Sequence, residues 1–222
     1  MQKTIAVMAI LSAALLLRAS GVFVVENGSS GGNQATCGGW WYTYNDASTG
    51  GNSAVTPEPG KFMKAKDGGV YSAKMKGRAG NKLGWDYVGM GVTLGNQSGC
   101  PGDAAPVNLT KYSTLTFKIK GSLSGGRLTI IIPYTANRCD EISNDTKTLT
   151  NWADYETAVQ AKLSKDWTMV KLYLRKDFKQ PRWAKKMVPV EDVLRNAHVI
   201  NWHFSSPDGD TVDIAVTDVE CN

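Results

Sequence analysis

Residues 167–183, W-T-M-V-K-L-Y-L-R-K-D-F-K-Q-P-R-W, decide the fold class of this chain. The first half of this stretch repeats apolar side chains with the two-residue period of a half-buried β-strand. The pattern ends in the charged turn 175–177, and Pro181, which has no N–H group for a sheet ladder, follows. A strand ending in Gln-Pro-x-Trp restricts which β-sandwich can form, and Trp183 either covers the core or lies at a rim. The residues predicted to point into the core are Trp167, Val170, Leu172 and Leu174.

The rest of the chain repeats this strand pattern with almost no helix. Residues 115–120, L-T-F-K-I-K, alternate cleanly between an apolar and a polar face. Turn signals rich in Gly, Pro and Asp separate such segments. Many short strands of this kind predict an all-β, antiparallel β-sandwich. The predicted strands are residues 40–44, 70–75, 87–94, 115–120, 128–134, 155–162, 169–174, 199–204 and 211–219, with one short helix at 189–196.

The first 36 residues of the 222-residue chain are predicted to precede the folded domain. Residues 1–21 combine a basic start, an apolar run and small residues, an order typical of a secretory signal peptide. The run is too short for a transmembrane helix, so the chain is predicted to be secreted or displayed at the cell surface. Residues 22–36, rich in Gly, Ser and Asn, are predicted to be a flexible linker. Residues 37–222 have the size of one β-sandwich domain with a single core.

The formal charge of the chain is +5, and its basic residues occur in short groups. Arg175-Lys176 and Lys185-Lys186 are pairs, and no long basic block occurs in the sequence. Nucleic-acid binding requires Lys and Arg clustered on one face. The pattern is instead typical of a solvated surface, so nucleic acid is not a predicted partner.

All four cysteines follow the predicted signal, and an even count in an exported chain favours disulfides. Cys37 and Cys221 bracket the domain, and terminal strands of sandwiches often lie side by side, which predicts a Cys37–Cys221 bond. Cys100 precedes strand 115–120 and Cys139 follows strand 128–134. A hairpin of these two strands would predict a Cys100–Cys139 bond. Zinc is disfavoured because the sequence has no Cys-x-x-Cys or His-x-His spacing.

Four segments together resemble the galactose-binding-like jelly-roll carbohydrate-binding modules, especially family 11 and related β-glucan-binding modules. The resemblance implies a jelly-roll sandwich that binds a plant-type polysaccharide, with β-glucan as its partner, and does not cleave it. The same strand pattern resembles the assembly factors of respiratory complex I, but a signal peptide and disulfides argue against those intracellular proteins. The four segments are W-Y-T-Y-N-D at 41–46 with the following G-G-N-S, residues 109–121, residues 167–183, and V-I-N-W at 199–202 with residues 213–220.

The resemblance implies a groove on the concave sheet in which aromatic rings stack on sugar rings and polar groups bond to hydroxyls. Phe117, Trp167 and Trp202 occupy strand positions with the phase of core residues, so they are not predicted to bind the ligand. In Trp85-Asp86-Tyr87, two aromatic residues share a face with an acid between them. For each aromatic candidate the alternative is a place in the core, and for His203 it is an ordinary hydrogen-bonded histidine. The predicted ligand-binding residues are Trp85, Asp86, Tyr87, Tyr134, Arg138, Asp140, Trp152, Tyr155 and His203.

The resemblance also implies a structural calcium ion, because this superfamily holds one between the first loop and the last strand. Asp46 precedes the Gly50-Gly51 turn and Asp218 lies on the last strand, so both are predicted to bind calcium through carboxylate oxygens. The alternative for both residues is ordinary surface charge.

Two other classes of function remain open. A glycoside hydrolase needs two carboxylates across the scissile bond, and Asp218 and Glu220 would share a strand face at about 7 Å, with Asp213 nearby. No aromatic active-site motif flanks these acids, and the sequence holds only two histidines, His198 and His203. A structural or adhesion domain of the cell surface would use the same sandwich without a glycan. The prediction is a monomer that binds polysaccharide, as a surface adhesin or a subunit of a polysaccharide-degrading system.

Overall fold

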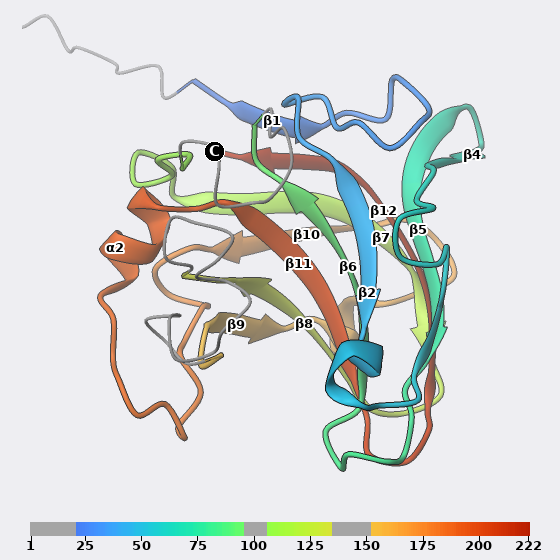
Figure 1. Cartoon of the computed structure of the whole chain (residues 1–222). Helices are drawn as coiled ribbons and strands as arrows, with labels where there is room; N and C mark the ends of the chain where they lie inside the picture. The colour runs from blue at the N-terminus through green and yellow to red at the C-terminus, as the bar shows by residue number, and fades with distance from the viewer. Residues whose placement is uncertain (1–20, 96–105, 135–151) are drawn as a thin grey trace, which may run out of the picture.

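The computed structural model describes residues 21–95, 106–134 and 152–222. In these residues, two antiparallel sheets face each other as a sandwich (Figure 1). The seven-stranded sheet has the order β10-β7-β12-β5-β3, with β1 beside β12 and β4 beside β5. The five-stranded sheet has the order β2-β6-β11-β8-β9. The predicted all-β fold, an antiparallel β-sandwich, is confirmed.

Most strands lie where the alternating pattern predicts them. The predicted strand 155–162 is the main exception, since β9 ends early and a short helical turn replaces its second half. The strands that the sequence did not predict, β1, β3 and β4, are only three or four residues long. No helix in the described part of the chain is long and apolar enough to cross a bilayer. The strands are β1 (Phe23–Glu26), β2 (Trp41–Asn45), β3 (Ala54–Thr56), β4 (Ala65–Asp67), β5 (Val70–Arg78), β6 (Tyr87–Thr93), β7 (Thr114–Leu123), β8 (Arg127–Ile132), β9 (Tyr155–Ala158), β10 (Thr168–Tyr173), β11 (Val199–Ser205) and β12 (Thr211–Cys221), and the helices are η1 (Asp46–Thr49), η3 (Gln160–Lys162) and α2 (Val190–Arg195).

Large aromatic side chains from both sheets fill the core. Phe117 of β7 meets Trp202 of β11 edge to face, with ring centroids 5.4 Å apart. Trp202 in turn lies 5.4 Å from Trp41 of β2. All three side chains are fully buried. Edge-to-face pairs contribute about 0.5–1.5 kcal/mol beyond the area that they bury, so this cluster joins the two sheets firmly.

Trp167 does not belong to this core, and the prediction that it points inward is wrong. Val170 and Leu172 of β10 are buried, whereas Met169 between them is exposed. Successive side chains of a strand point to opposite faces, so an odd-numbered position in β10 faces outward. The ring of Trp167 accordingly lies 4.9 Å from the Lys120 ammonium, and Lys120 is an outward-facing residue of β7.

Residues 22–36 fold against the sandwich, so the prediction of a flexible linker is wrong. Strand β1 pairs with β12, with Phe23 opposite Cys221. The side chain of Glu26 is fully buried, where it forms an ion pair with Lys64 at 2.8 Å and accepts a hydrogen bond from Trp41 Nε1 at 3.0 Å. Breaking a buried ion pair of this kind costs about 3–5 kcal/mol, so the segment is part of the folded domain. The Gly and Ser residues of this segment form its tight turns.

The structure bears on both predicted disulfides. Cys37 lies beside the paired ends of β1 and β12, since its N–H donates to Val25 O at 3.1 Å, but Cys37 and Cys221 are both free thiols. Burial and the neighbouring Cys37 raise the pKa of Cys221 to about 12. A bond between these two residues stays a prediction. Cys100 and Cys139 lie outside the described residues, and the hairpin that would join them is absent from the described strands, because β7 and β8 belong to different sheets.

Candidate functional site

The outer face of the five-stranded sheet carries two tyrosines from β2. Trp41 and Thr43 of this strand are buried against the core, while Tyr42 and Tyr44 alternate with them and point outward. This placement follows from the two-residue period of the strand. The W-Y-T-Y sequence therefore supplies one core aromatic and two surface aromatics.

Glycines in the neighbouring strand β6 allow these rings to lie close to the sheet. Gly91 is in register with Tyr42, and Gly89 with Tyr44. A Cβ at Gly89 would overlap the ring of Tyr44, and a Cβ at Gly91 would overlap the side chains of Asn201 and Tyr42. Because Gly91 has no side chain, the Tyr42 hydroxyl can reach over it and donates a hydrogen bond to Asn201 Oδ1 at 2.8 Å. The two glycines thus form a floor on which the tyrosine rings rest.

The aromatic surface continues along β6 and β11. The hydroxyl of Tyr44 and Nδ1 of His203 share a hydrogen bond at 3.1 Å, and the rings of Tyr87 and His203 are 5.1 Å apart. Trp85 stacks on Tyr87 with centroids 6.0 Å apart, and 55% of its side chain is exposed. We call this group of five side chains the aromatic platform: Tyr42, Tyr44, Trp85, Tyr87 and His203.

The aromatic platform carries no charge near neutral pH. Burial raises the pKa of Tyr42 and of Tyr44 well above the usual value, so both hydroxyls stay protonated. Burial, and secondly the positive charge of Arg127, lower the pKa of His203 to about 4, so its imidazole is neutral. The surface therefore offers ring faces and neutral hydrogen-bonding groups.

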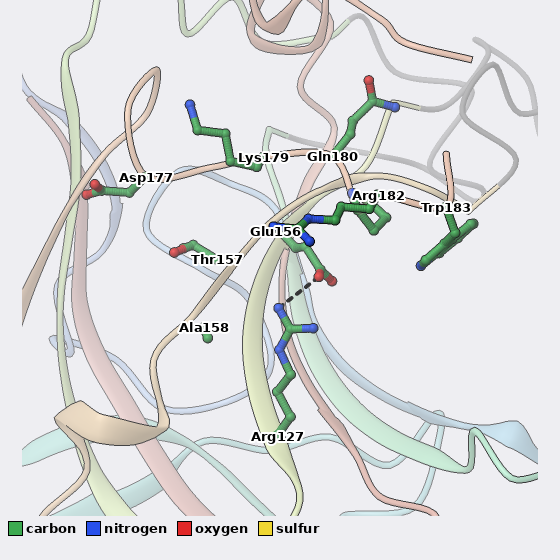
Figure 2. Close-up of a pocket in the computed structure, with 10 residues that line it drawn as sticks. Arg127, Glu156, Thr157, Ala158, Asp177, Lys179, Gln180, Arg182 and Trp183 are labelled. Carbon is green, nitrogen blue, oxygen red and sulfur yellow. Dashed lines mark ion pairs between the residues drawn. The ribbon is translucent and has the colours of Figure 1, made fainter. Parts of the chain in front are cut away.

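A pocket of about 470 Å³ opens at the β9 edge of the same sheet (Figure 2). Arg127 of β8 and Glu156 of β9 form an ion pair across it at 2.9 Å. Arg127 and Tyr87 are both in register with Ser205, on either side of β11. Two inter-strand spacings, about 10 Å, therefore separate Tyr87 of the aromatic platform from Arg127, on the near side of the edge pocket. Other polar or aromatic lining residues are Asp177, Lys179, Arg182 and Trp183.

Gln180 fixes the wall of the edge pocket. Its side-chain amide donates to the carbonyl oxygens of Ala153 at 2.7 Å and Lys186 at 3.2 Å, and its Oε1 accepts the Val188 N–H at 2.8 Å. Gln180 is buried, whereas Trp183 is 62% exposed. The Gln-Pro-x-Trp sequence thus places Trp183 at the rim of a pocket and not over the core.

Asp86 lies between two platform residues but does not join them. Its buried carboxylate accepts the backbone N–H groups of Lys82, Leu83 and Gly84 at 2.8–3.0 Å. Burial raises the pKa of this carboxyl, but the backbone N–H donors outweigh burial and lower the pKa below its usual value. Asp86 therefore holds the turn that presents Trp85 and Tyr87, and the structure does not place it where a ligand could reach it.

The structure separates the remaining predicted ligand residues from the aromatic platform. Tyr134 and Tyr155 pack against the core, and the Tyr155 hydroxyl donates to Val188 O at 2.7 Å. Trp152 is exposed, but its ring is not among those that contact the platform. Arg138 and Asp140 lie outside the described residues. Of the nine predicted residues, Trp85, Tyr87 and His203 come together.

Sequence reasoning missed Tyr42, Tyr44 and Asn201, which the structure brings to the same surface. A usable signal was present in residues 87–92, Y-V-G-M-G-V, where glycine occupies two alternate positions of a strand. Glycine in a strand interior often marks the close approach of another group. Arg127 and Glu156 gave no comparable signal, because single charged residues at strand ends are common.

The two residues predicted to bind calcium do not fit a shared ion. The Asp46 carboxylate is buried and accepts hydrogen bonds from Ser53 N, Ser53 Oγ and Tyr87 N. Asp218 pairs with Lys118 at 2.9 Å. Asp46 thus lies beside the start of β6, whereas Asp218 lies near the end of β12 beside β7 of the other sheet. Among the described residues, no three His, Cys, Asp or Glu side chains are grouped as a metal site.

The three acids of the hydrolase alternative lie on the other sheet. Asp213, Asp218 and Glu220 face outward from β12, a strand of the seven-stranded sheet. Lys74 is 3.8 Å from Asp213, and Lys118 pairs with Asp218. None of the three acids lines the edge pocket. This arrangement does not place a carboxylate pair beside the aromatic surface.

No protein-family model and no curated protein sequence matches this chain. Solved structures share its fold. A family 11 carbohydrate-binding module of a cellulosomal cellulase of Clostridium thermocellum has a TM-score of 0.53 and 11% identity, over 90% of this chain and 94% of that one. The family 11 module from Clostridium thermocellum in complex with a β-1,3-1,4-mixed-linked tetrasaccharide also gives 0.53, at 12% identity, over 90% and 95%.

A family 30 carbohydrate-binding module has a TM-score of 0.51 and 15% identity, over 90% of this chain and 98% of that one. The predicted resemblance to these jelly-roll modules is therefore confirmed for the fold. At such low identity the likeness does not transfer a ligand, which must be argued from the site itself.

Proposed function

We propose that this chain is an exported protein that binds a β-glucan chain without cleaving it. The aromatic platform is the observation that carries the proposal. Its rings can lie against the apolar C–H faces of sugars, while the tyrosine hydroxyls and the Asn201 amide can bond to sugar hydroxyls. The ordered turn at Asp86 and the glycine floor hold these rings in place before a ligand arrives, which lowers the entropy cost of binding.

The shape of the surface favours an internal stretch of a polysaccharide over a chain end. The strip from β2 to β9 crosses four inter-strand spacings, about 19 Å. A single glycan chain of this length could lie across the strands. Exposed stacking of this kind gives modest affinity, on the order of micromolar to millimolar.

The assignment to β-glucan and to binding alone has two supports. The family 11 module with the same fold is described in complex with a mixed-linked β-tetrasaccharide. The carboxylates that a hydrolase would need are on the opposite sheet from the aromatic platform. Export is supported by the signal-like residues 1–21.

Affinity electrophoresis tests the proposal. Gels that contain barley β-glucan, xyloglucan or soluble cellulose should retard the wild-type protein in at least one case. The double variant Trp85→Ala/Tyr87→Ala should lose this retardation. The control is Tyr173→Ala, which removes an exposed aromatic from β10 of the other sheet. Unchanged mobility of the wild type in every glycan gel would overturn the proposal.

A further inference from the structure

Residues 175–186, R-K-D-F-K-Q-P-R-W-A-K-K, concentrate positive charge in a short stretch that contributes to the edge pocket; we call them the basic segment. The segment contains six of the 25 basic residues and one of the 20 acidic residues of the chain. Its formal charge therefore equals the +5 of the whole protein, and the remainder of the chain is formally neutral. Of the six basic residues, Lys179 and Arg182 line the edge pocket, whereas Lys176 lies over the Tyr173 ring of β10.

Backbone hydrogen bonds attach the basic segment to the edge of the five-stranded sheet. The N–H of Glu156 donates to Lys179 O, and the N–H of Lys179 donates to Glu156 O, both at 3.0 Å. The segment thus continues the sheet beyond β9. Buried Gln180 then fixes the following turn, so Arg182 and Trp183 are held beside Arg127 and Glu156 (Figure 2).

The charges of the edge pocket are not balanced within the described part of the chain. Arg127 is paired with Glu156, and Asp177 accepts the N–H of Tyr173 at 2.7 Å. Lys179 and Arg182 form no ion pair with an acid among the described residues, and both are exposed. Three cations and two acids line the pocket, which leaves an excess of positive charge at its rim.

Arg175 is the exception in the basic segment, because it has a structural role. Its guanidinium forms an ion pair with Glu191 and donates to the carbonyl oxygens of Tyr112 and Thr110. Lys179 and Arg182 have no such partners in the described part of the chain, so their charge is available to a ligand.

We propose that the edge pocket binds the carboxylate of a uronic acid residue in a polysaccharide whose neutral part lies on the aromatic platform. This inference rests on the proposed function and deepens it, because the ligand becomes a glucan-like chain that carries acidic sugars. The planar guanidinium of Arg182 can bind a carboxylate through two parallel hydrogen bonds, and Lys179 adds a point charge. Trp183 offers an exposed ring to the same sugar. Arg127 lies two inter-strand spacings from Tyr87, and Lys179 lies two spacings further along the same sheet, so a glycan chain that spans about 19 Å can reach both the platform and the cations.

The test compares two forms of one polymer. Barley β-glucan is used unmodified and after oxidation of a minor fraction of its glucose units at C6 to glucuronate. The wild type should bind the oxidised form about tenfold more tightly at low salt, which is the effect of two exposed charge pairs. In Lys179→Gln/Arg182→Gln the ratio of the two affinities should fall to about one. The control Lys66→Gln/Lys76→Gln removes two exposed charges from β4 and β5 of the other sheet and should keep the wild-type ratio.

The outcomes separate the inference from the proposed function. Equal affinity of the wild type for both polymers overturns the inference and leaves glucan binding in place. A preference that survives in Lys179→Gln/Arg182→Gln, or that is unchanged in about 1 M salt, where screening acts within about 3 Å, also overturns it. If neither polymer is bound, the proposed function fails, and the inference fails with it. The salt dependence is measured on the wild type alone. This test therefore remains valid even if a substitution disturbs folding.

Discussion

The outer faces of the two sheets present polar and aromatic residues in different ways. On the seven-stranded sheet, two lysines of β7 are matched by acids: Lys118 pairs with Asp218 at 2.9 Å and Lys120 with Asp67 at 2.6 Å. On the five-stranded sheet, the aromatic platform is uncharged, and Lys179 and Arg182, which have no acidic partner among the described residues, lie at its β9 edge. Matched surface pairs contribute little to stability or binding, about 0–1 kcal/mol each. The comparison therefore supports the proposal that the five-stranded sheet is the binding face and the seven-stranded sheet is a solvated face.

The same alternation of side chains produces both faces. In β2 and β6 the outward positions hold tyrosine and glycine, and in β7 and β5 they hold lysine, threonine and other polar residues. The difference between them comes from which residue types occupy the outward positions and from the register between strands. Four predictions test this difference, from the largest expected effect to the smallest.

Removal of two rings from the aromatic platform should have the largest effect. The double variant Tyr44→Ala/Tyr87→Ala should weaken β-glucan binding about 100-fold, because each ring stacked on a sugar is expected to contribute about 1.4 kcal/mol, a factor of ten. Isothermal titration with a mixed-linked β-glucan oligosaccharide measures the change. Tyr173→Ala on β10 is the matched control and should bind like the wild type. Equal losses in both variants would contradict the distinction between the faces.

His203 should make stability depend on pH. Its pKa is lowered to about 4 by burial and by Arg127, against about 6.5 in the unfolded chain. Between these values the unfolded state binds a proton that the folded state does not, so the free energy of unfolding falls as the pH is lowered. We expect a loss of roughly 2 kcal/mol between pH 7 and pH 4.5. Urea unfolding at a series of pH values should show a flatter profile for His203→Gln, and identical profiles would refute this role.

The glycine floor should contribute a smaller amount to binding. Gly89→Ala places a methyl group where the Tyr44 ring lies, so the ring should move away from the sheet while the fold stays intact. We expect affinity for β-glucan to fall about tenfold, since one platform ring leaves its position. Gly91→Ala should act in the same way through Tyr42 and Asn201. If both variants bind β-glucan with wild-type affinity, the two glycines are not required to position the tyrosine rings.

Changes on the solvated face should have no effect on glycan binding. The variants Asp218→Asn and Glu220→Gln alter acids of β12 and should leave the affinity unchanged. The wild type should release no reducing sugar from β-glucan on prolonged incubation. Sugar release that Glu220→Gln abolishes would instead establish the hydrolase alternative.

The sequence predicted the layers of the fold because alternation is a local property. Residues 115–120 and 199–204 show the two-residue period plainly, and both are strands of the structure. Strand β1 was not predicted because it has only four residues and precedes a run of Gly, Ser and Asn. Its stability depends on the pairing with β12 and on the buried ion pair between Glu26 and Lys64. These two residues are 38 positions apart in the sequence. The expected hairpin of β7 and β8 does not form, because local turn signals do not determine which sheet the next strand joins.

The candidate site was predicted in part. Trp85 and Tyr87 could be recognised because two aromatic residues two positions apart on a strand share a face. Asp86 was assigned to the ligand by proximity in sequence, whereas the structure uses its carboxylate to hold a turn. Tyr42 and Asn201 are far apart in the chain, and only the register of β2, β6 and β11 brings them together. Trp183 could be recognised as unusual, but its place at a pocket rim depends on the hydrogen bonds of Gln180.

Mapping of the bound surface by NMR tests the central claim most directly. A mixed-linked β-glucan oligosaccharide is titrated into the labelled protein, and the backbone amide shifts are followed. The predicted result is a set of shifts concentrated in β2, β6 and β11, around Tyr44, Gly89 and His203. Shifts concentrated in β5, β7 and β12, or no shifts with any glucan, would contradict the assignment of the five-stranded sheet as the binding face.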